Sequence, residues 1–235
     1  MIDNRRVVAV VPARGGSTTV PNKNLRRLGD RPLVAWPIDA AEATPEIDRT
    51  VVTTDDPSIA AVARDHGAEV VERPADLATD DALVADALRH VLGELRDEGE
   101  TADVVVMLEP TCPLRTPGDV QQCLDRLVSS DCDSVATFTE AGLNPHRAWR
   151  FDDDGDPTPF LTGADPWQPR QSLPESYELT GAVYAFERDA LPKAGSSLLF
   201  ERPGAVLLPR ERSVDLDTEL DFAVAEALLA EGVHE

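Results

Sequence analysis

Short apolar runs alternate with amphipathic stretches along most of the chain. The apolar runs are rich in valine and predict buried β-strands at 7–11, 50–54, 68–71, 104–108, 134–139, 182–186 and 205–208. In the stretches between them, apolar residues recur at the spacing of an α-helix that packs one face on a sheet. These stretches predict helices at 33–43, 59–66, 82–95, 117–128 and 218–230.

This alternation predicts an α/β fold, Rossmann-like, with a mainly parallel sheet flanked by helices. Ligands of such sheets bind at the carboxyl ends of the strands. The 235 residues are enough for one domain of this kind, spanning 1–235. The alternation stops at 140–180, a segment rich in Pro, Gly, Asp and Trp. Long irregular segments usually carry function, so we predict here a small inserted excursion that contacts substrate or a partner.

The composition is strongly acidic, with 44 Asp and Glu against 22 Lys and Arg and a net charge of −22. Such a surface repels phosphate backbones and anionic lipids, so we expect neither nucleic acid nor a membrane as partner. The acidity is dispersed, which is typical of surface solvation in a salt-rich cytoplasm. The three cysteines indicate no disulfide framework and no zinc site, and no apolar stretch approaches the ~20 residues of a membrane span. We therefore expect a cytoplasmic protein.

The first predicted strand leads directly into Ala13-Arg14-Gly15-Gly16-Ser17, and Lys23-Asn24 follow. Glycines let successive N–H groups turn toward one point, and two cations supply charge for phosphates, so the pattern predicts a phosphate-binding loop. It matches neither the Walker loop nor the G-x-G-x-x-G fingerprint. The alternative is a plain strand-to-helix turn with both cations in solvent.

A second chemical pattern comes just before the last predicted helix, at Asp215-Leu216-Asp217-Thr218. In an extended segment residues two apart face the same way, so Asp215 and Asp217 present two carboxylates together. Two hard oxygen ligands suit Mg²⁺, which takes water and phosphate oxygens for its remaining positions. The alternative is helix capping by Asp217 or Thr218.

Taken in order, these motifs resemble the acylneuraminate cytidylyltransferases, the CMP-sialic acid synthetase family. The resemblance covers nearly the whole chain and rests on 13–24, 53–56, 73–80, 109–115, 170–171, 180–184, Asp215 and Asp217. It implies a fold of the nucleotide-diphospho-sugar transferase type. It also implies transfer of CMP from CTP to the anomeric hydroxyl of a nonulosonic, sialic-acid-like nine-carbon sugar acid, with release of pyrophosphate.

The resemblance further implies a role for each matching residue. Arg14, Lys23 and Asp217 would be catalytic, and Asp215 and Asp217 would hold Mg²⁺. The implied nucleotide-binding residues are Ala13, Arg14, Gly15, Gly16, Ser17, Lys23, Asn24 and Arg73. The implied sugar-binding residues are Glu109, Arg170, Gln171, Thr180 and Tyr184. A homodimer is also implied.

Three positions depart from the family pattern. Thr18 stands where Lys is common, Glu109 replaces Gln, and Thr180 replaces Asn. The last two fall where the acceptor sugar is expected, so the acceptor can differ from ordinary N-acetylneuraminate. Two alternatives stay open: a nucleotidyltransferase of the same fold that uses another NTP or a sugar 1-phosphate, and a nucleotide-binding module without turnover, which the missing Lys at Thr18 favours.

Overall fold

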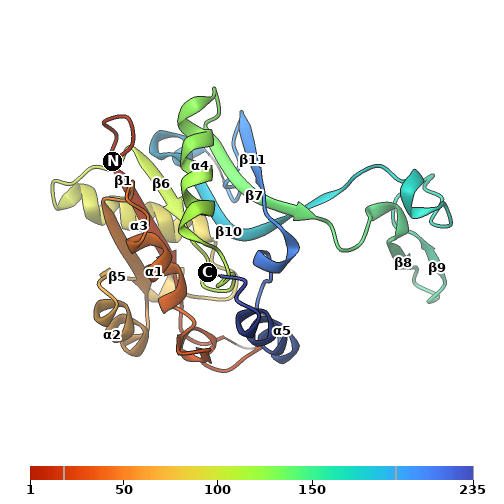
Figure 1. Ribbon diagram of the computed structural model, residues 1–235, viewed down its shortest axis with the longest axis horizontal. Helices are drawn as coiled ribbons and strands as arrows, with labels where there is room; N and C mark the ends of the chain where they lie inside the picture. The colour runs from red at the N-terminus through yellow and green to blue at the C-terminus, as the bar shows by residue number, and fades with distance from the viewer. Residues whose placement is uncertain (18, 194, 235) are drawn as a thin grey trace.

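Strand β1 (Val7–Pro12) lies in the middle of a seven-stranded sheet with the order β11-β7-β10-β6-β1-β4-β5 (Figure 1). The computed structural model describes residues 1–17, 19–193 and 195–234. The other strands of this sheet are β4 (Arg49–Thr54), β5 (Glu69–Glu72), β6 (Val104–Met107), β7 (Ser134–Glu140), β10 (Tyr177–Glu187) and β11 (Pro203–Leu207). Two small antiparallel hairpins, β2 (Arg27–Leu28) with β3 (Arg31–Pro32) and β8 (Trp149–Phe151) with β9 (Pro157–Pro159), complete the strands.

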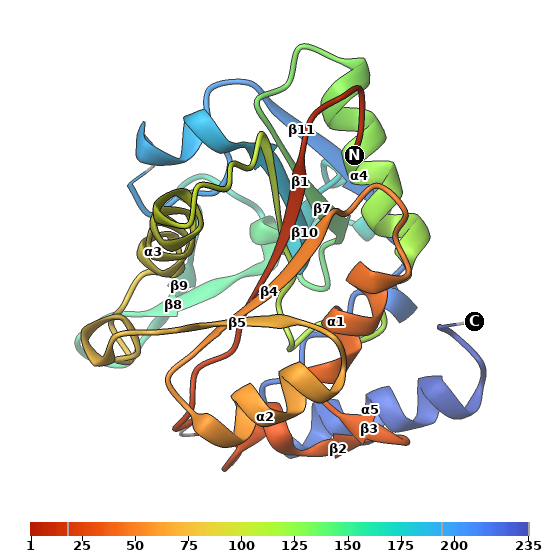
Figure 2. The same cartoon turned by 90° about the vertical axis from the view of Figure 1, so that its left-hand side faces the viewer.

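The helices lie on both faces of the sheet. The α-helices are α1 (Ala35–Glu42), α2 (Pro57–Asp65), α3 (Val84–Asp97), α4 (Pro117–Ser129) and α5 (Glu219–Ala230). Short 3₁₀-helices are η1 (Lys23–Leu25), η2 (Ala75–Leu77), η3 (Pro145–Arg147), η4 (Arg170–Ser172), η5 (Arg188–Lys193) and η6 (Arg210–Arg212). Figure 2 shows α3 on one side of the strands and α1 and α4 on the other.

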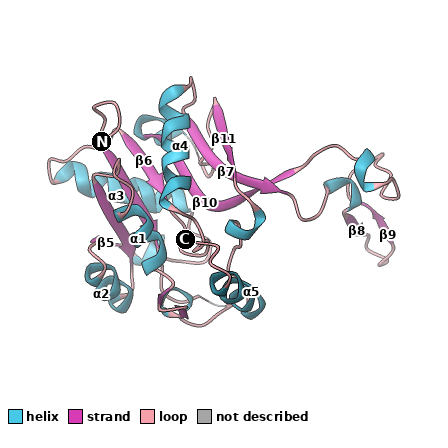
Figure 3. Ribbon diagram, in the orientation of Figure 1, coloured by secondary structure: helices cyan, strands magenta, loops and turns pink. Residues whose placement is uncertain are grey.

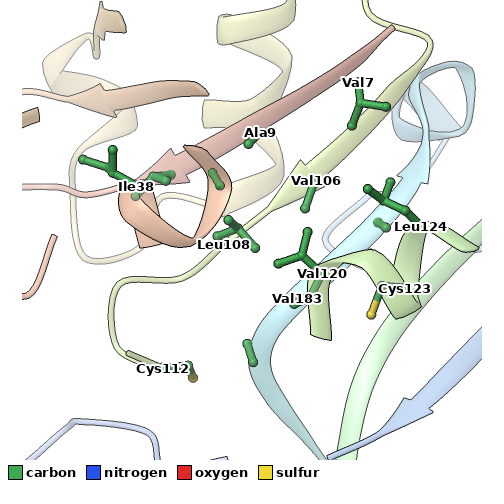
Figure 4. Close-up of a cluster of buried hydrophobic side chains, with 14 of the residues drawn as sticks. Val7, Ala9, Ile38, Val106, Leu108, Cys112, Val120, Cys123, Leu124 and Val183 are labelled. Atoms are coloured by element: carbon green, nitrogen blue, oxygen red, sulfur yellow. The ribbon is translucent and has the colours of Figure 1, made fainter. Parts of the chain in front are cut away.

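Alternation along β1 divides the core into two layers. Val7, Ala9 and Val11 pack with α1, α2 and α4 on one face of the sheet, as Figure 4 shows in part. Val8 and Val10 pack with α3 on the opposite face. All five side chains are buried, so the sequence of β1 is a continuous apolar run and does not alternate between apolar and polar residues. A third cluster packs α5 against the β2–β3 hairpin and around buried Leu216.

The observed sheet confirms the predicted fold class. Strands β1, β4, β5 and β6 pair in parallel, and β11 pairs in parallel with β7. Strand β10 is antiparallel to both of its neighbours, β6 and β7. Each predicted strand and helix corresponds to an observed element, with ends that differ by a few residues except in one strand. That exception is β10, which begins at Tyr177, inside the segment predicted to be irregular.

Residues 141–176, here called the arm, leave the sheet between β7 and β10 and carry the β8–β9 hairpin (Figure 3). Glu140 pairs with Tyr177, so the arm starts and ends at neighbouring positions of two paired strands. Figure 1 shows the arm reaching away from the helices and the sheet. Several of its large apolar side chains are exposed, with 83% of Trp167 and 71% of Phe151 accessible.

Among the described residues, no helix is long and apolar enough to cross a membrane. Cys112, Cys123 and Cys132 are unpaired.

Candidate active site

The glycine-rich loop after β1 is held by backbone hydrogen bonds. The Ala13 N–H donates to a carbonyl of β4 (3.1 Å), and the Gly15 N–H donates to Asp55 Oδ1 (2.8 Å). A β-carbon on Gly15 would lie 3.2 Å from Asp56 Cβ, which is tight for any larger residue. Gly16 has φ +68°, in the left-handed region that favours glycine. The loop therefore has the conformation that its glycines permit.

Lys23 and Asn24 follow on a single 3₁₀ turn that Asn22 begins in a left-handed conformation. Asn24 Nδ2 donates to the Arg14 carbonyl at 2.9 Å, which ties this turn to the glycine loop. Lys23 Nζ lies 2.9 Å from Asp217 Oδ1. Residues from the two ends of the chain therefore meet at one point. Thr18 lies outside the described residues.

The segment before α5 presents its two aspartates as the alternation predicts. Leu216 between them is fully buried, and its N–H donates to the Thr111 carbonyl at 2.8 Å. Thr218 is the N-cap of α5, in a capping box with Asp221. Because Thr218 does the capping, Asp217 is free to face Lys23. Both interpretations of this segment therefore hold: Thr218 caps the helix, and Asp217 pairs with Lys23.

A depression of about 390 Å³ opens at the carboxyl ends of β1 and β6. From the predicted set it is lined by Arg14, Ser17, Lys23, Asn24, Arg73, Glu109 and Asp217. The structure thus brings most of the predicted nucleotide residues together. Ala13 is buried beside it, and Gly15 and Gly16 border a smaller adjoining hollow with Lys23.

Arg73 is buried, with 7% of its surface accessible. Its Nη2 donates to the Thr53 carbonyl at 2.8 Å. Burial lowers the pKa of Arg73 to about 10, with Asp55 acting in the opposite sense and Arg14 adding to the lowering. The guanidinium is thus held in one place by β4 at one end of the depression.

Glu109 follows β6 and is largely buried at the other end of the depression. Burial, followed by the nearby Asp215 carboxylate, raises the pKa of Glu109 to about 7. A β-carbon on Gly181 would lie 2.9 Å from Glu109 Oε2, and Gly181 has φ +72°. Arg115, itself buried, donates to the backbone carbonyls of Glu109 and Ala182. The Glu109 turn and the irregular part of β10 are therefore fastened to each other.

The two predicted sugar-binding residues on β10, Thr180 and Tyr184, have different environments. Thr180 is 4% accessible, and its hydroxyl exchanges hydrogen bonds with Thr137 on β7 at 2.6 Å. It also accepts from the Ala182 N–H, so this hydroxyl serves the strand irregularity. Tyr184 is half-buried near Glu109, and burial followed by the Glu109 carboxylate raises its pKa. The Thr180 side chain is therefore engaged within the sheet, and its contact with a sugar stays a prediction.

Arg170 and Gln171 are not brought to this depression within one chain. They lie on η4 in the arm and line a separate hollow of about 700 Å³ where the arm leaves the sheet. Arg170 Nη2 lies 3.3 Å from Glu140 Oε1 at the arm's base. Both residues of this pair are exposed, so the pair holds Arg170 only weakly.

Sequence reasoning missed several residues of the site. Asp80 pairs with Arg14 at 2.6 Å. Thr111 and Leu83 line the depression. Asp80 and Thr111 fall inside motifs that carried the family resemblance, and this resemblance was the only signal for them. Leu83 had no signal, because its sequence pattern is that of an ordinary apolar residue next to a helix.

The fold and site are of the nucleotidyltransferase type. They combine a mainly parallel α/β sheet, a glycine loop with cations after the first strand, and an acidic pair facing that loop. The chain belongs to the cytidylyltransferase family, whose model matches residues 8–192.

Individual relatives agree with this assignment. The N-acylneuraminate cytidylyltransferase of Streptococcus agalactiae serotype V is 30% identical over 92% of the chain, which spans about half (51%) of that relative. The CMP-N,N'-diacetyllegionaminic acid synthase of Legionella pneumophila is 30% identical over 95% of the chain and 96% of its own length. A solved CMP:2-keto-3-deoxy-manno-octonic acid synthetase in complex with CTP superposes with a TM-score of 0.70 at 19% identity, covering 97% of this chain and 99% of that one. This last likeness confirms the fold.

Proposed function

We propose that this protein transfers CMP from CTP to the anomeric hydroxyl of a nonulosonic sugar acid and releases pyrophosphate. The family and the names of its relatives support this reaction. The observation that carries it is the contact between Lys23 on the N-terminal loop and Asp217 before the last helix, across one depression. Nucleotidyl transfer depends on positioning and charge neutralisation, and a cation facing an acidic pair provides both.

For the nucleotide, Arg14 and Lys23 would bind the triphosphate, with support from the N–H groups of Gly16 and Ser17. Lys23 is 13% accessible in its side chain, so its charge is little screened by solvent. It would neutralise charge that builds up on the departing pyrophosphate. Asn24 and Arg73, at the same end of the depression, would contact the base.

For the metal, Asp215 and Asp217 would hold Mg²⁺. Burial, opposed by a Thr111 hydrogen bond and aided by Asp217, raises the pKa of Asp215. A bound cation would offset the repulsion between the two carboxylates, so the raised pKa of Asp215 fits a metal site. No group of three or more metal-binding side chains occurs in the described part of the chain. The remaining ligands would be waters and phosphate oxygens, as Mg²⁺ prefers. Bound there, Mg²⁺ would neutralise phosphate charge.

For the acceptor, Glu109 lines the depression and Tyr184 lies near Glu109. An ionised Glu109 accepts hydrogen bonds and repels a carboxylate, whereas Gln both donates and accepts. An acceptor that presents a hydroxyl or an amine to Glu109 is therefore favoured over one that presents its carboxylate. The sugar carboxylate would then face Arg170, whose guanidinium can bind both oxygens.

Arg170 and Gln171 lie away from the depression of their own chain. They would therefore contact a sugar only in the depression of another chain. We therefore propose a homodimer in which the exposed apolar surface of the arm, including Trp167 and Phe151, is covered by the second copy. We also propose a cytoplasmic enzyme with no nucleic-acid or membrane partner, as the acidic surface favours.

Pyrophosphate release in a matrix of four NTPs against several nonulosonic acids and sugar 1-phosphates tests the reaction. The expected result is release with CTP and at least one nonulosonic acid. Release only with GTP or UTP and a sugar phosphate would show the rival nucleotidyltransferase, and nucleotide binding without release in any combination would show a binding module.

The metal assignment predicts that Asp217→Ala lowers turnover at least about 100-fold, because one hard ligand and the partner of Lys23 are lost. Asp125→Ala, at an exposed position of α4, is the charge-matched control and should keep wild-type turnover. Activity and Mg²⁺-dependent CTP binding are measured for both. Unchanged values in the Asp217 variant would rule out this metal site.

A further inference from the structure

Two of the three cationic side chains that line the depression, Arg14 and Lys23, already have a carboxylate partner in the structure. Lys23 pairs with Asp217, which belongs to the acidic pair discussed above. Arg14 pairs with Asp80, at 2.6 Å between Nη2 and Oδ1. Asp80 has no part in the proposed chemistry. It lies on the loop between η2 and α3, whose residues Thr79 and Leu83 line the nucleotide end of the depression.

The Arg14–Asp80 pair differs from a structural ion pair in its exposure. The Asp80 side chain is 65% accessible and that of Arg14 is 35% accessible, so little is buried by their contact. Asp80 has no other hydrogen-bond or ion-pair partner among the described residues. Arg14, by contrast, stays anchored without it, because its backbone carbonyl accepts from Asn24 and the next N–H donates to Asp55. Losing Asp80 therefore leaves the loop in place.

A carboxylate and a phosphate present the same feature to a guanidinium, namely anionic oxygens spaced for its N–H groups. Asp80 thus occupies Nη2 of Arg14, which a triphosphate would otherwise contact. Once displaced, Asp80 returns to solvent at little cost because it is already exposed. Its charge, however, stays close to the triphosphate and repels it.

We propose that Asp80 is an internal competitor of the triphosphate for Arg14 and sets the nucleotide affinity of the site. The inference rests on the proposed function in that Arg14 binds the triphosphate. Each binding event then exchanges one ion pair for another at Arg14. The site discriminates against ligands with too few phosphates, since only a ligand that replaces Asp80 at Arg14 recovers the lost pair.

Asp80→Asn removes the competing charge, and Asp81→Asn is the matched control. Asp81 is the exposed neighbour of Asp80 with no ion pair among the described residues, and the substitution changes net charge equally. Calorimetry measures binding of CTP and of pyrophosphate, without sugar, at low and high salt. We expect Asp80→Asn to bind both ligands about two- to five-fold tighter than Asp81→Asn, with the advantage shrinking at high salt.

Equal or weaker binding by Asp80→Asn would overturn the inference, because Asp80 would then be neutral or would help to position Arg14. Thermal unfolding of all three proteins should coincide and so exclude a folding effect. Pyrophosphate keeps this test separate from the proposed reaction. If CTP does not bind while pyrophosphate does, the proposed function fails, and the role of Asp80 is still decided by pyrophosphate.

Discussion

At the scale of single residues, Glu109 is the side chain whose environment departs most from that of an ordinary surface carboxylate. It is buried beside Asp215 and has no hydrogen-bond donor to its carboxylate among the described residues. The fold therefore disfavours its ionised form. This is a cost to stability, which a bound acceptor with a suitable donor would offset.

The pH dependence of stability follows from the sign of this shift. The folded pKa of about 7 lies above the ordinary Glu value of 4.5, so folded Glu109 keeps a proton that the unfolded chain releases. Its destabilising effect is absent below pH 4.5, grows as pH rises and is complete above pH 7. Glu109→Gln removes it. We expect the variant to gain on the order of 3 kcal/mol over wild type between pH 4 and pH 8.

Denaturant unfolding of metal-free protein at several pH values measures this difference. Glu72→Gln, at an exposed position, is the control and should show a flat difference. A flat difference for Glu109→Gln as well would mean that solvent reaches Glu109 freely.

At the scale of elements, the cap of α5 is also part of the site, because Thr218 directly follows Asp217. Thr218→Ala removes the side-chain acceptor for the Asp221 N–H and is expected to cost about 1 kcal/mol of stability. The substitution should also lower turnover, because the capping box no longer fixes the backbone next to Asp217. Thr218→Ser keeps the hydroxyl and is the control. Stability loss with full turnover would show that the cap and Asp217 are independent.

Sequence reasoning predicted the sheet well because its strands are continuous apolar runs bounded by turn residues, as at β1 and β6. It placed the start of β10 too late. Gly181 takes a left-handed conformation between Leu179 and Tyr184, where the register with β7 shifts, and this irregularity interrupts the alternation that marks a strand. The same irregularity buries Thr180.

The candidate site was predictable where a motif and its strand end coincide, as for Arg14 and Lys23. Asp80 was not singled out, because an exposed acid in a chain with 44 of them carries no distinguishing pattern. The position of Arg170 was also beyond sequence reasoning, since the direction of a long inserted segment depends on contacts that have no local signature.

At the scale of the whole molecule, the proposed dimer makes each site depend on two chains. Heterodimers purified from co-expressed Lys23→Ala and Arg170→Ala chains with different tags should regain about half of wild-type turnover, because one of the two sites is then intact. Each variant alone should be nearly inactive. No recovery in the heterodimer would mean that Arg170 does not act across the interface.

The antiparallel direction of β10 has a consequence for how this molecule can change. Because β7 and β10 are direct neighbours, the arm is a long hairpin loop inserted between paired residues Glu140 and Tyr177. Its length and sequence can vary without changing any strand pairing or connection of the sheet. The part of the molecule that would meet the acceptor and the second copy is thus a replaceable module, whereas the nucleotide end is built into the core.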